Sequence, residues 1–292
     1  EFQVPEEVKE DMISLVHKGK SIEDKWNIKL ENYKKSKPDL HEELLLSINN
    51  NLPQNWDEEI LNSLEESNKP EASRVSSGLS INILSKSIPN LIGGSADLTG
   101  STNTEIKDSG NFSMDNYSGK NLKFGVREHG MGGIINGISA HGSHRIFGGT
   151  FLVFSDYMRG SIRLSALSKL NSIWIFTHDS IGLGEDGPTH QPISQLMSLR
   201  SIPNLNVFRP ADRRETLLSW HKAIMQKDRP SALILSRQAL PSIESVSNFK
   251  LNLETFGKGA YSCYENTNDN PDIIYISTGS ELSATILSLI HI

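Results

Sequence analysis

IWIFTHDSIGLGEDGPTHQP, residues 173–192, begins with an apolar run and continues into a loop that carries two histidines, three acids and three glycines. The run, Ile173–Phe176, predicts a short buried strand. Open α/β sheets bind their ligands beyond the carboxyl ends of the strands. A loop so rich in titratable side chains, directly after such a strand, therefore predicts both the fold class and the location of the chemistry.

Apolar runs and helical patterns alternate along the chain around this segment. The runs are Leu91–Ile92, Leu122–Phe124, Ile173–Thr177, Asn206–Phe208 and Ala232–Leu235, and the helical patterns lie near 128–140, 155–169, 193–200 and 213–227. This alternation predicts an α/β fold, a doubly wound and mostly parallel sheet with helices on both faces. A last strand is expected at Asp272–Ile276 and a last helix from Glu281.

Glycine usage divides the chain. Residues 1–70 contain only Gly19, whereas 17 of the 22 glycines lie between Gly93 and Gly187. Proline and acids at residues 5–7 and 38–39, and a capping-box-like Ser21–Asp24, predict an arm of short helices in the first part. We expect a helical connector arm at 1–70, an α/β domain at 71–250 and the incomplete start of a second α/β domain at 251–292.

Composition excludes several classes of function. The net charge of −6 and the pI of about 5.9 disfavour binding to nucleic acid, and no basic amphipathic stretch indicates a membrane surface. No apolar run is long enough for a signal peptide core or a membrane span. The single cysteine, Cys263, cannot form an internal disulfide. These features predict a cytoplasmic protein.

Three other interpretations of the loop are open. Gly182–Gly187 matches the spacing of the dinucleotide fingerprint, although Pro188 follows the third glycine and two acids stand where phosphates would approach. A zinc site could use His178, Asp179 and His190, but the compact spacing of zinc motifs is missing. The loop could also bind no ligand at all.

Seven segments together resemble the pyrimidine-binding domain of the transketolase family of thiamine-diphosphate enzymes, in family order. They are Gly93–Thr99, Phe124–His129, Gly148–Phe151, Arg163–Leu167, the loop of 178–192, Arg209–Asp212 and Ser236–Pro241. The resemblance covers essentially the whole chain, with 1–70 similar to the family's connector and the last 40 or so residues similar to the start of its third domain.

The resemblance implies an activity and an assembly. Members of the family move a two-carbon ketol group from a ketose phosphate, such as xylulose 5-phosphate, to an aldose phosphate, such as ribose 5-phosphate or erythrose 4-phosphate, in the pentose phosphate pathway. The cofactors implied are thiamine diphosphate and Mg²⁺. The implied assembly is a homodimer with each active site at the subunit interface.

The resemblance assigns cofactor-binding residues on the pyrimidine side of the site. They are Asp97, Leu98, Glu128, Phe151, Phe154 and Tyr157. Glu128 matches the catalytic carboxylate that favours the imino tautomer of the aminopyrimidine, which then acts as the base. The alternative for Glu128 is a charge that complements a helix N-terminus. The aromatic residues, spaced by three, could instead be core residues.

The resemblance also assigns substrate-binding residues. Arg74, Ser101, His178 and Arg237 match the positions that bind the sugar phosphate, and guanidinium groups and hydroxyls suit an oxyanion. Asp186 and His190 match positions that orient substrate hydroxyls. Glu128, His178 and His190 form the predicted catalytic set.

Two departures from the family pattern limit how far its properties carry over to this chain. The Gly-Asp-Gly motif that holds Mg²⁺ and the diphosphate is absent, so we expect no metal ligands here, no cofactor binding by the fragment and no activity in isolation. Arg213-Arg214 also replaces the usual Gly-Asn. The alternatives are a non-catalytic interaction module of the same fold and a deoxyxylulose-phosphate synthase, a family that lacks the Arg127–His129 pattern.

Overall fold

The computed structural model describes residues 3–65, 69–265 and 270–289, which divide into two compact units at Asn51 and Leu52. The first unit contains helices α1 (Glu6–Ser36) and α2 (Pro38–Ile48). The expected helix start at Ser21 is wrong, because α1 runs through it without interruption. Lys20 pairs with Glu23 and Asp24 across one turn of this helix, and such i,i+3 and i,i+4 pairs favour a continuous helix.

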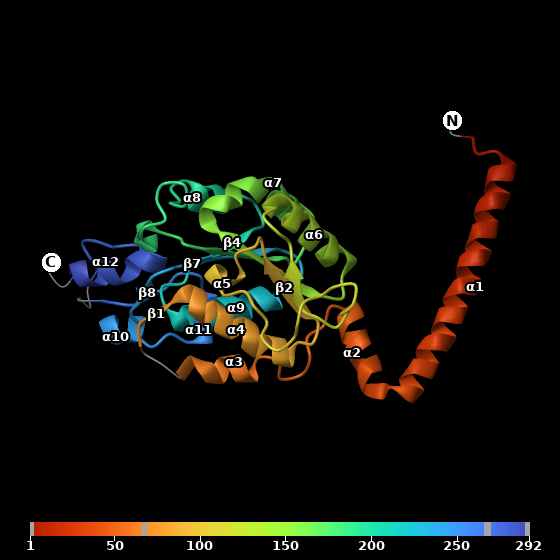
Figure 1. Ribbon diagram of the computed structural model, residues 1–292, viewed down its shortest axis with the longest axis horizontal. Helices are drawn as coiled ribbons and strands as arrows, with labels where there is room; N and C mark the ends of the chain where they lie inside the picture. The colour runs from red at the N-terminus through yellow and green to blue at the C-terminus, as the bar shows by residue number, and fades with distance from the viewer. Residues whose placement is uncertain (1–2, 66–68, 266–269, 290–292) are drawn as a thin grey trace. The chain divides into compact units, whose positions relative to one another are not determined.

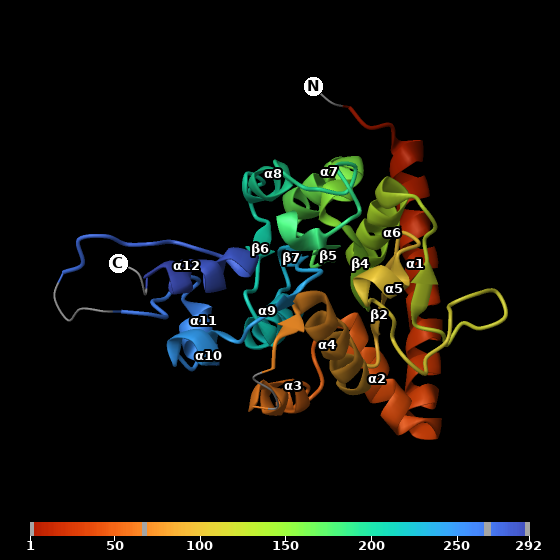
Figure 2. The same cartoon turned by 60° about the vertical axis from the view of Figure 1, so that its left-hand side comes forward.

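The second unit is built on a parallel sheet of six strands in the order β3-β2-β4-β5-β7-β6. The strands are β2 (Leu91–Ser95), β3 (Asn121–Lys123), β4 (Arg145–Phe151), β5 (Ile173–Thr177), β6 (Asn206–Phe208) and β7 (Ser231–Leu235). In Figure 2, β6, β7, β5, β4 and β2 follow one another across the view. A separate antiparallel pair joins β1 (Glu71–Ala72) to β8 (Ala239–Leu240).

Helices cover both faces of this sheet (Figure 1). One face packs on α4 (Ser73–Ser87) and α9 (Arg213–Met225), through a core that includes Phe147, Ile175 and Trp220. The other face packs on α6 (Glu128–His141), α7 (Ser155–Leu167) and α8 (Gln195–Arg200). The predicted doubly wound α/β fold is confirmed.

Strand β4 lies in the middle of the sheet and was not predicted. All seven of its residues are buried, and two of them are glycines, which are depleted in strands. A Cβ at Gly148 would lie 2.2 Å from Ile135 Cδ1, and one at Gly149 would lie 2.7 Å from Thr104 Cγ2. The glycines are therefore needed because α6 and the segment around Thr104 pack directly against the strand.

The remaining short helices connect these layers. They are α3 (Glu58–Asn62), η1 (Ser63–Glu65), α5 (Thr99–Thr102), η2 (Leu152–Phe154), η3 (Ile181–Leu183), α10 (Ile243–Ser247), α11 (Leu253–Gly257), η4 (Gly279–Glu281) and α12 (Leu282–Leu289). Trp56 and Ile60 share the core with α4 and α9. The end of the predicted arm, from Leu52 onward, therefore packs with the α/β unit, which differs from the boundary predicted at residues 70 and 71.

The expected strand at Asp272–Ile276 is wrong, because this segment forms no strand. Its Ile273, Ile274 and Ile276 side chains are exposed, and no described strand pairs with it. The expected last helix is present as α12, one residue later than predicted. None of the helices in the described part of the chain is long and apolar enough to cross a membrane.

Candidate active site

The predicted site residues follow the carboxyl ends of the central strands. Asp97 and Leu98 come after β2, Phe151 ends β4, His178 follows β5 and Arg237 follows β7. Because all these strands are parallel, these ends lie along one edge of the sheet. This is the edge at which doubly wound sheets bind ligands.

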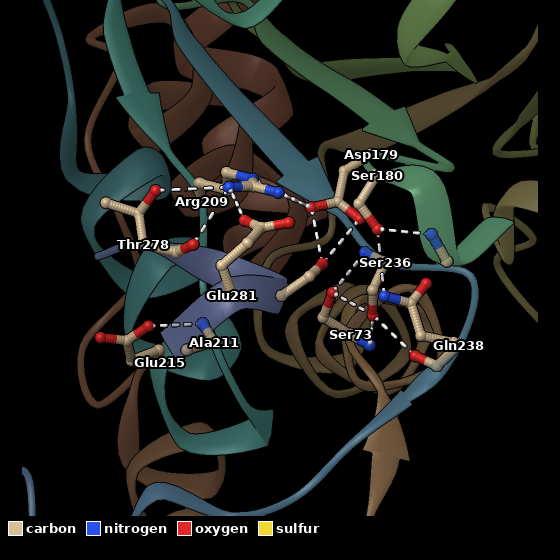
Figure 3. Close-up of polar contacts among 12 residues, drawn as sticks. Ser73, Asp179, Ser180, Arg209, Ala211, Glu215, Ser236, Gln238, Thr278 and Glu281 are labelled. Carbon is tan, nitrogen blue, oxygen red and sulfur yellow. Dashed lines mark hydrogen bonds and ion pairs between the residues drawn. The ribbon is translucent and has the colours of Figure 1, made fainter. Parts of the chain in front are cut away.

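Two serines bring two arginines together at this edge. Ser73 and Ser236 exchange hydrogen bonds, since the Ser236 amide donates to Ser73 Oγ at 2.7 Å and the Ser73 amide donates to Ser236 Oγ at 3.0 Å (Figure 3). The pair joins the start of α4 to the end of β7. Arg74 and Arg237 each directly follow one of these serines, so the connection places both guanidinium groups on the same part of the edge.

Arg74 carries an unused hydrogen-bond donor. Its Nη1 donates to the Ser101 carbonyl oxygen at 2.6 Å, whereas its Nε is buried and has no hydrogen-bond partner. Burial lowers the pKa of Arg74, and the neighbouring positive charge of Arg237 lowers it further, while Asp186 opposes both. An arginine with an unused buried donor, next to the positive charge of a second arginine, favours an anion as ligand.

His178 lies between these arginines and the aromatic residues. Its imidazole is buried and stacks on Phe151 with a centroid distance of 3.8 Å, and its Nδ1 lies 2.8 Å from Thr177 Oγ1. Burial, together with Arg74, lowers the pKa of His178 to about 4. His178 is therefore neutral at pH 7 and can exchange a hydrogen bond with a ligand through its other ring nitrogen.

Aromatic rings form a continuous cluster beside His178. Phe151 stacks on Phe154 at 5.6 Å, and Phe154 stacks on Tyr157 at 5.8 Å. His190 contacts Phe151 and Phe154 edge to face, at 5.7 and 5.3 Å. Tyr157 remains 68% exposed. The cluster thus extends from a buried end at Phe151 to an open end at Tyr157, which suits a flat heteroaromatic ligand.

Glu128 is the first residue of α6 and is buried. Its Oε1 accepts a hydrogen bond of 3.3 Å from Thr150, the neighbour of Phe151 in β4. This contact holds the carboxylate at the carboxyl end of β4, one residue before Phe151. The geometry supports both interpretations of Glu128, because the residue lies at a helix N-terminus and also beside the end of β4.

The acidic end of the loop lies on the arginine side. Arg237 Nη2 is 3.5 Å from Glu185 Oε1, and the negative charge of Asp186 acts on both Arg74 and His178. Leu183 is buried and anchors the loop. The loop is also tied to the segment between β7 and β8, because Gln238 Nε2 donates to Ser180 Oγ at 3.1 Å (Figure 3).

Asp97, Leu98 and Ser101 form a separate turn at the same edge. Asp97 is exposed and has a positive φ of 64°, and the Leu98 amide donates to Ser95 Oγ at 3.0 Å. Ser101 takes part in the arginine group through its backbone carbonyl. A role for the Ser101 hydroxyl stays a prediction.

Sequence reasoning missed Thr150, which had no motif of its own, and it considered Asp179 only as one ligand of a disfavoured zinc site. The Asp179 carboxylate forms an ion pair with Arg209 rather than joining the two histidines. The described residues contain no group of three or more His, Cys, Asp and Glu side chains arranged to hold a metal ion. The only sequence signal for the Asp179 contact was the Arg209–Asp212 segment.

Comparison with known proteins identifies relatives over nearly the whole chain. Residues 70–242 match the family model of the transketolase pyrimidine binding domain, and residues 1–53 match that of the transketolase thiamine diphosphate binding domain. The chain is 47% identical to the transketolase of Bacillus subtilis and 44% identical to that of Aquifex aeolicus, and each alignment covers 98% of this chain. It spans only 42% and 40% of those relatives.

Solved structures give the same result. A transketolase from Pichia stipitis in complex with sedoheptulose 7-phosphate superimposes with a TM-score of 0.91 at 40% identity, over 99% of this chain and 42% of that one. The transketolase of Leishmania mexicana superimposes with a TM-score of 0.90 at 35% identity, over 99% of this chain and 42% of that one.

Proposed function

Because this chain belongs to the transketolase family, we propose that it supplies the pyrimidine and sugar-phosphate side of an enzyme that transfers a two-carbon ketol group between sugar phosphates. The proposed donor is xylulose 5-phosphate and the proposed acceptors are ribose 5-phosphate and erythrose 4-phosphate, in the pentose phosphate pathway. The observation that carries this proposal is that the Arg74 Nε is buried without a hydrogen-bond partner and that a second guanidinium group, that of Arg237, lies near it.

Arg74 and Arg237 bind the phosphate of the sugar in this proposal, together with Ser101 and His178. A guanidinium group donates to phosphate oxygens with matching geometry. The neutral state of His178 lets it accept as well as donate, which suits a sugar hydroxyl as its partner. Asp186 and His190, on the same loop, orient further hydroxyls of the substrate.

The residues beside the aromatic cluster fit the pyrimidine part of thiamine diphosphate. Phe151, Phe154 and Tyr157 would hold its ring, with Asp97 and Leu98 at the neighbouring turn, and Glu128 would hold a proton next to it. When bound, the cofactor supplies the carbon nucleophile that attacks the ketose carbonyl. The buried position of Glu128 and its hydrogen bond from Thr150 support this role, since proton transfer requires a carboxyl group that is held in place.

His178 and His190 lie where the substrate carbonyl and hydroxyls would meet the aromatic cluster. A neutral imidazole can stabilise the charge that develops on the carbonyl oxygen by donating a hydrogen bond. It can also return a proton at a later step. We assign the catalytic roles to Glu128, His178 and His190 on these grounds.

Assembly as a homodimer completes the proposal. Apolar side chains of α6 and α7 remain exposed, with Ile134 at 48%, Leu164 at 53% and Leu167 at 65%. Val126, two residues before Glu128, is 75% exposed. Exposed apolar side chains next to the candidate site support an interface there. The diphosphate and Mg²⁺ would then bind to the thiamine diphosphate binding domain of the partner subunit. A cytoplasmic location stays a prediction from the sequence.

A chimeric enzyme tests the proposal. The chain replaces the matching segment of the Bacillus subtilis transketolase, and transfer from xylulose 5-phosphate to ribose 5-phosphate is measured by a coupled assay. We expect turnover that depends on thiamine diphosphate and Mg²⁺. A chimera that folds and binds the cofactor but transfers no ketol group would contradict the proposed function, and favour a non-catalytic module.

A further inference from the structure

A buried ion pair lies directly behind the loop of the candidate site. Arg209 Nε donates to Asp179 Oδ2 at 2.9 Å, and its Nη2 lies 2.8 Å from the same oxygen. The Asp179 side chain is only 1% exposed and the Arg209 side chain 9%. Arg209 follows β6 and Asp179 follows β5, so the pair joins the ends of two strands of the sheet that are not neighbours.

The C-terminal segment completes this pair (Figure 3). Ser280 Oγ lies 3.0 and 2.9 Å from the two Asp179 oxygens and donates to them. Arg209 Nη1 donates to the Thr278 carbonyl oxygen at 3.0 Å and pairs with Glu281. We define Asp179, Arg209, Thr278, Ser280 and Glu281 as the Asp179 network.

The backbone of the C-terminal segment is fitted to this contact. Gly279 has a φ of 61°, and a Cβ at this position would lie 2.6 Å from Arg209 Cγ. A side chain is therefore excluded both by conformation and by space. The close approach brings Thr278 and Ser280 within hydrogen-bonding distance on either side of this glycine.

Burial makes the network sensitive to the loss of any member. It raises the pKa of Asp179, while Arg209 and the hydroxyl of Ser280 oppose this effect. A buried carboxylate that loses a donor is left with an unpaired charge or must take up a proton. The full set of contacts therefore holds Asp179 in one position.

Asp179 is bonded to His178, whose backbone is in the left-handed region with a φ of 63°. This conformation is uncommon for a residue with a side chain, although histidine adopts it more often than most, and surrounding contacts help to hold it. The His178 side chain stacks on Phe151, whereas the Asp179 side chain engages Arg209. Successive side chains are thus held in two different environments, and each fixes the peptide bond between them.

We propose that Asp179 and Arg209 are positioning residues for His178, and that the Thr278–Glu281 segment completes them, so that the C-terminal part of the chain orders the sugar-phosphate side of the site. The link to sugar phosphates rests on the proposed function. The positioning of the loop does not, because it follows from contacts that need no ligand.

Amide hydrogen exchange in this chain, without ligand, tests the positioning. The reporters are Gly182 and Leu183, whose amides are protected by Ser180. Ser280→Ala removes a donor to Asp179 from 101 residues away. We expect exchange in peptides covering 178–184 to become about tenfold faster, as the loss of a hydrogen bond to a charged group implies. Arg209→Gln should have a larger effect.

Ser283→Ala is the matched control, since Ser283 lies one turn further along and forms none of the hydrogen bonds or ion pairs described for the Asp179 network; it should leave exchange unchanged. Ser280→Thr, which keeps the hydroxyl, should retain slow exchange. Unchanged exchange at 178–184 in both Ser280→Ala and Arg209→Gln would overturn the proposal. So would equal acceleration in peptides from β5 and β7, because that result indicates global destabilisation. Failure of the ketol-transfer assay alone would affect only the proposed function.

Discussion

Substitution of Arg74 gives the sharpest test of the sugar-phosphate assignment. Arg74→Gln removes the guanidinium group and its positive charge while keeping a shorter polar side chain. In the chimeric enzyme, the variant loses at least one hydrogen bond to a charged group, which costs about 1.5–3 kcal/mol. This corresponds to a decrease of about ten- to a hundredfold in kcat/KM for phosphorylated substrates.

Neighbouring charges modify this value in opposite directions. Arg237 and Arg74 repel each other. This repulsion is absent in the variant, so Arg237 can bind the phosphate without it. Asp186, which attracts Arg74, would instead repel the phosphate without compensation. Because these two effects oppose each other, we base the expected loss on the hydrogen bond alone.

The assay compares substrates with and without a phosphate. Xylulose 5-phosphate with ribose 5-phosphate should show the full decrease, whereas hydroxypyruvate with an unphosphorylated acceptor should change little. Arg229→Gln is the matched control, because Arg229 is 44% exposed and pairs only with the neighbouring Asp228 among the contacts described. An equal decrease for both substrate pairs would refute the assignment and make Arg74 a structural charge.

Three further predictions address the cofactor, the catalytic carboxylate and the pH dependence of stability. This chain alone should show no micromolar binding of thiamine diphosphate with Mg²⁺ in titration calorimetry, because the diphosphate ligands lie elsewhere in the family; micromolar binding would contradict this. Glu128→Ala in the chimera should lower turnover by at least about a hundredfold with folding intact, as expected for a proton-transfer group, and near-normal turnover at saturating cofactor would leave Glu128 as a helix-terminal charge. Burial raises the pKa of Glu215 to about 7 from 4.5, so this carboxyl group binds more protons in the folded than in the unfolded state between these values, and its own contribution to stability falls by up to about 3 kcal/mol from pH 4.5 to pH 7. The lowered pKa of His178 acts in the opposite direction, so the contribution of Glu215 is measured as the difference in urea unfolding between this chain and Glu215→Gln. That difference should change by up to about 3 kcal/mol across the range, and a difference that does not vary with pH would contradict the assignment to Glu215.

The edge of the sheet that carries the candidate site residues was predictable because these residues lie in short motifs at strand ends. His178 and Arg237 each follow an apolar run that the sequence marks clearly, and parallel strands bring such ends to one edge. The arrangement of Arg74 beside Arg237 has no comparable signal. It depends on hydrogen bonds between Ser73 and Ser236, two common residue types 163 positions apart.

The errors in the fold have the opposite origin, since they arise where tertiary packing overrides local preference. Strand β4 contains glycines because α6 and the segment around Thr104 lie against it, so local propensity argues against one of the two central strands of the sheet. Asp272–Ile276 shows the converse case. Its β-branched residues predict a strand, but a strand needs a partner, and none of the described strands offers one to it.

The Asp179 network combines both kinds of difficulty. Asp179 stands in the most informative loop of the chain, where the sequence suggested its carboxylate only as one ligand of a disfavoured zinc site. The structure instead gives it an arginine from the end of β6 and a serine from the C-terminal segment. A carboxylate that is 1% exposed and already accepts from two side chains has little capacity left for a ligand. Its effect on the site must therefore pass through the backbone of His178, and this is why a substitution at Ser280, outside the matched pyrimidine binding domain, should alter the order of a loop within it.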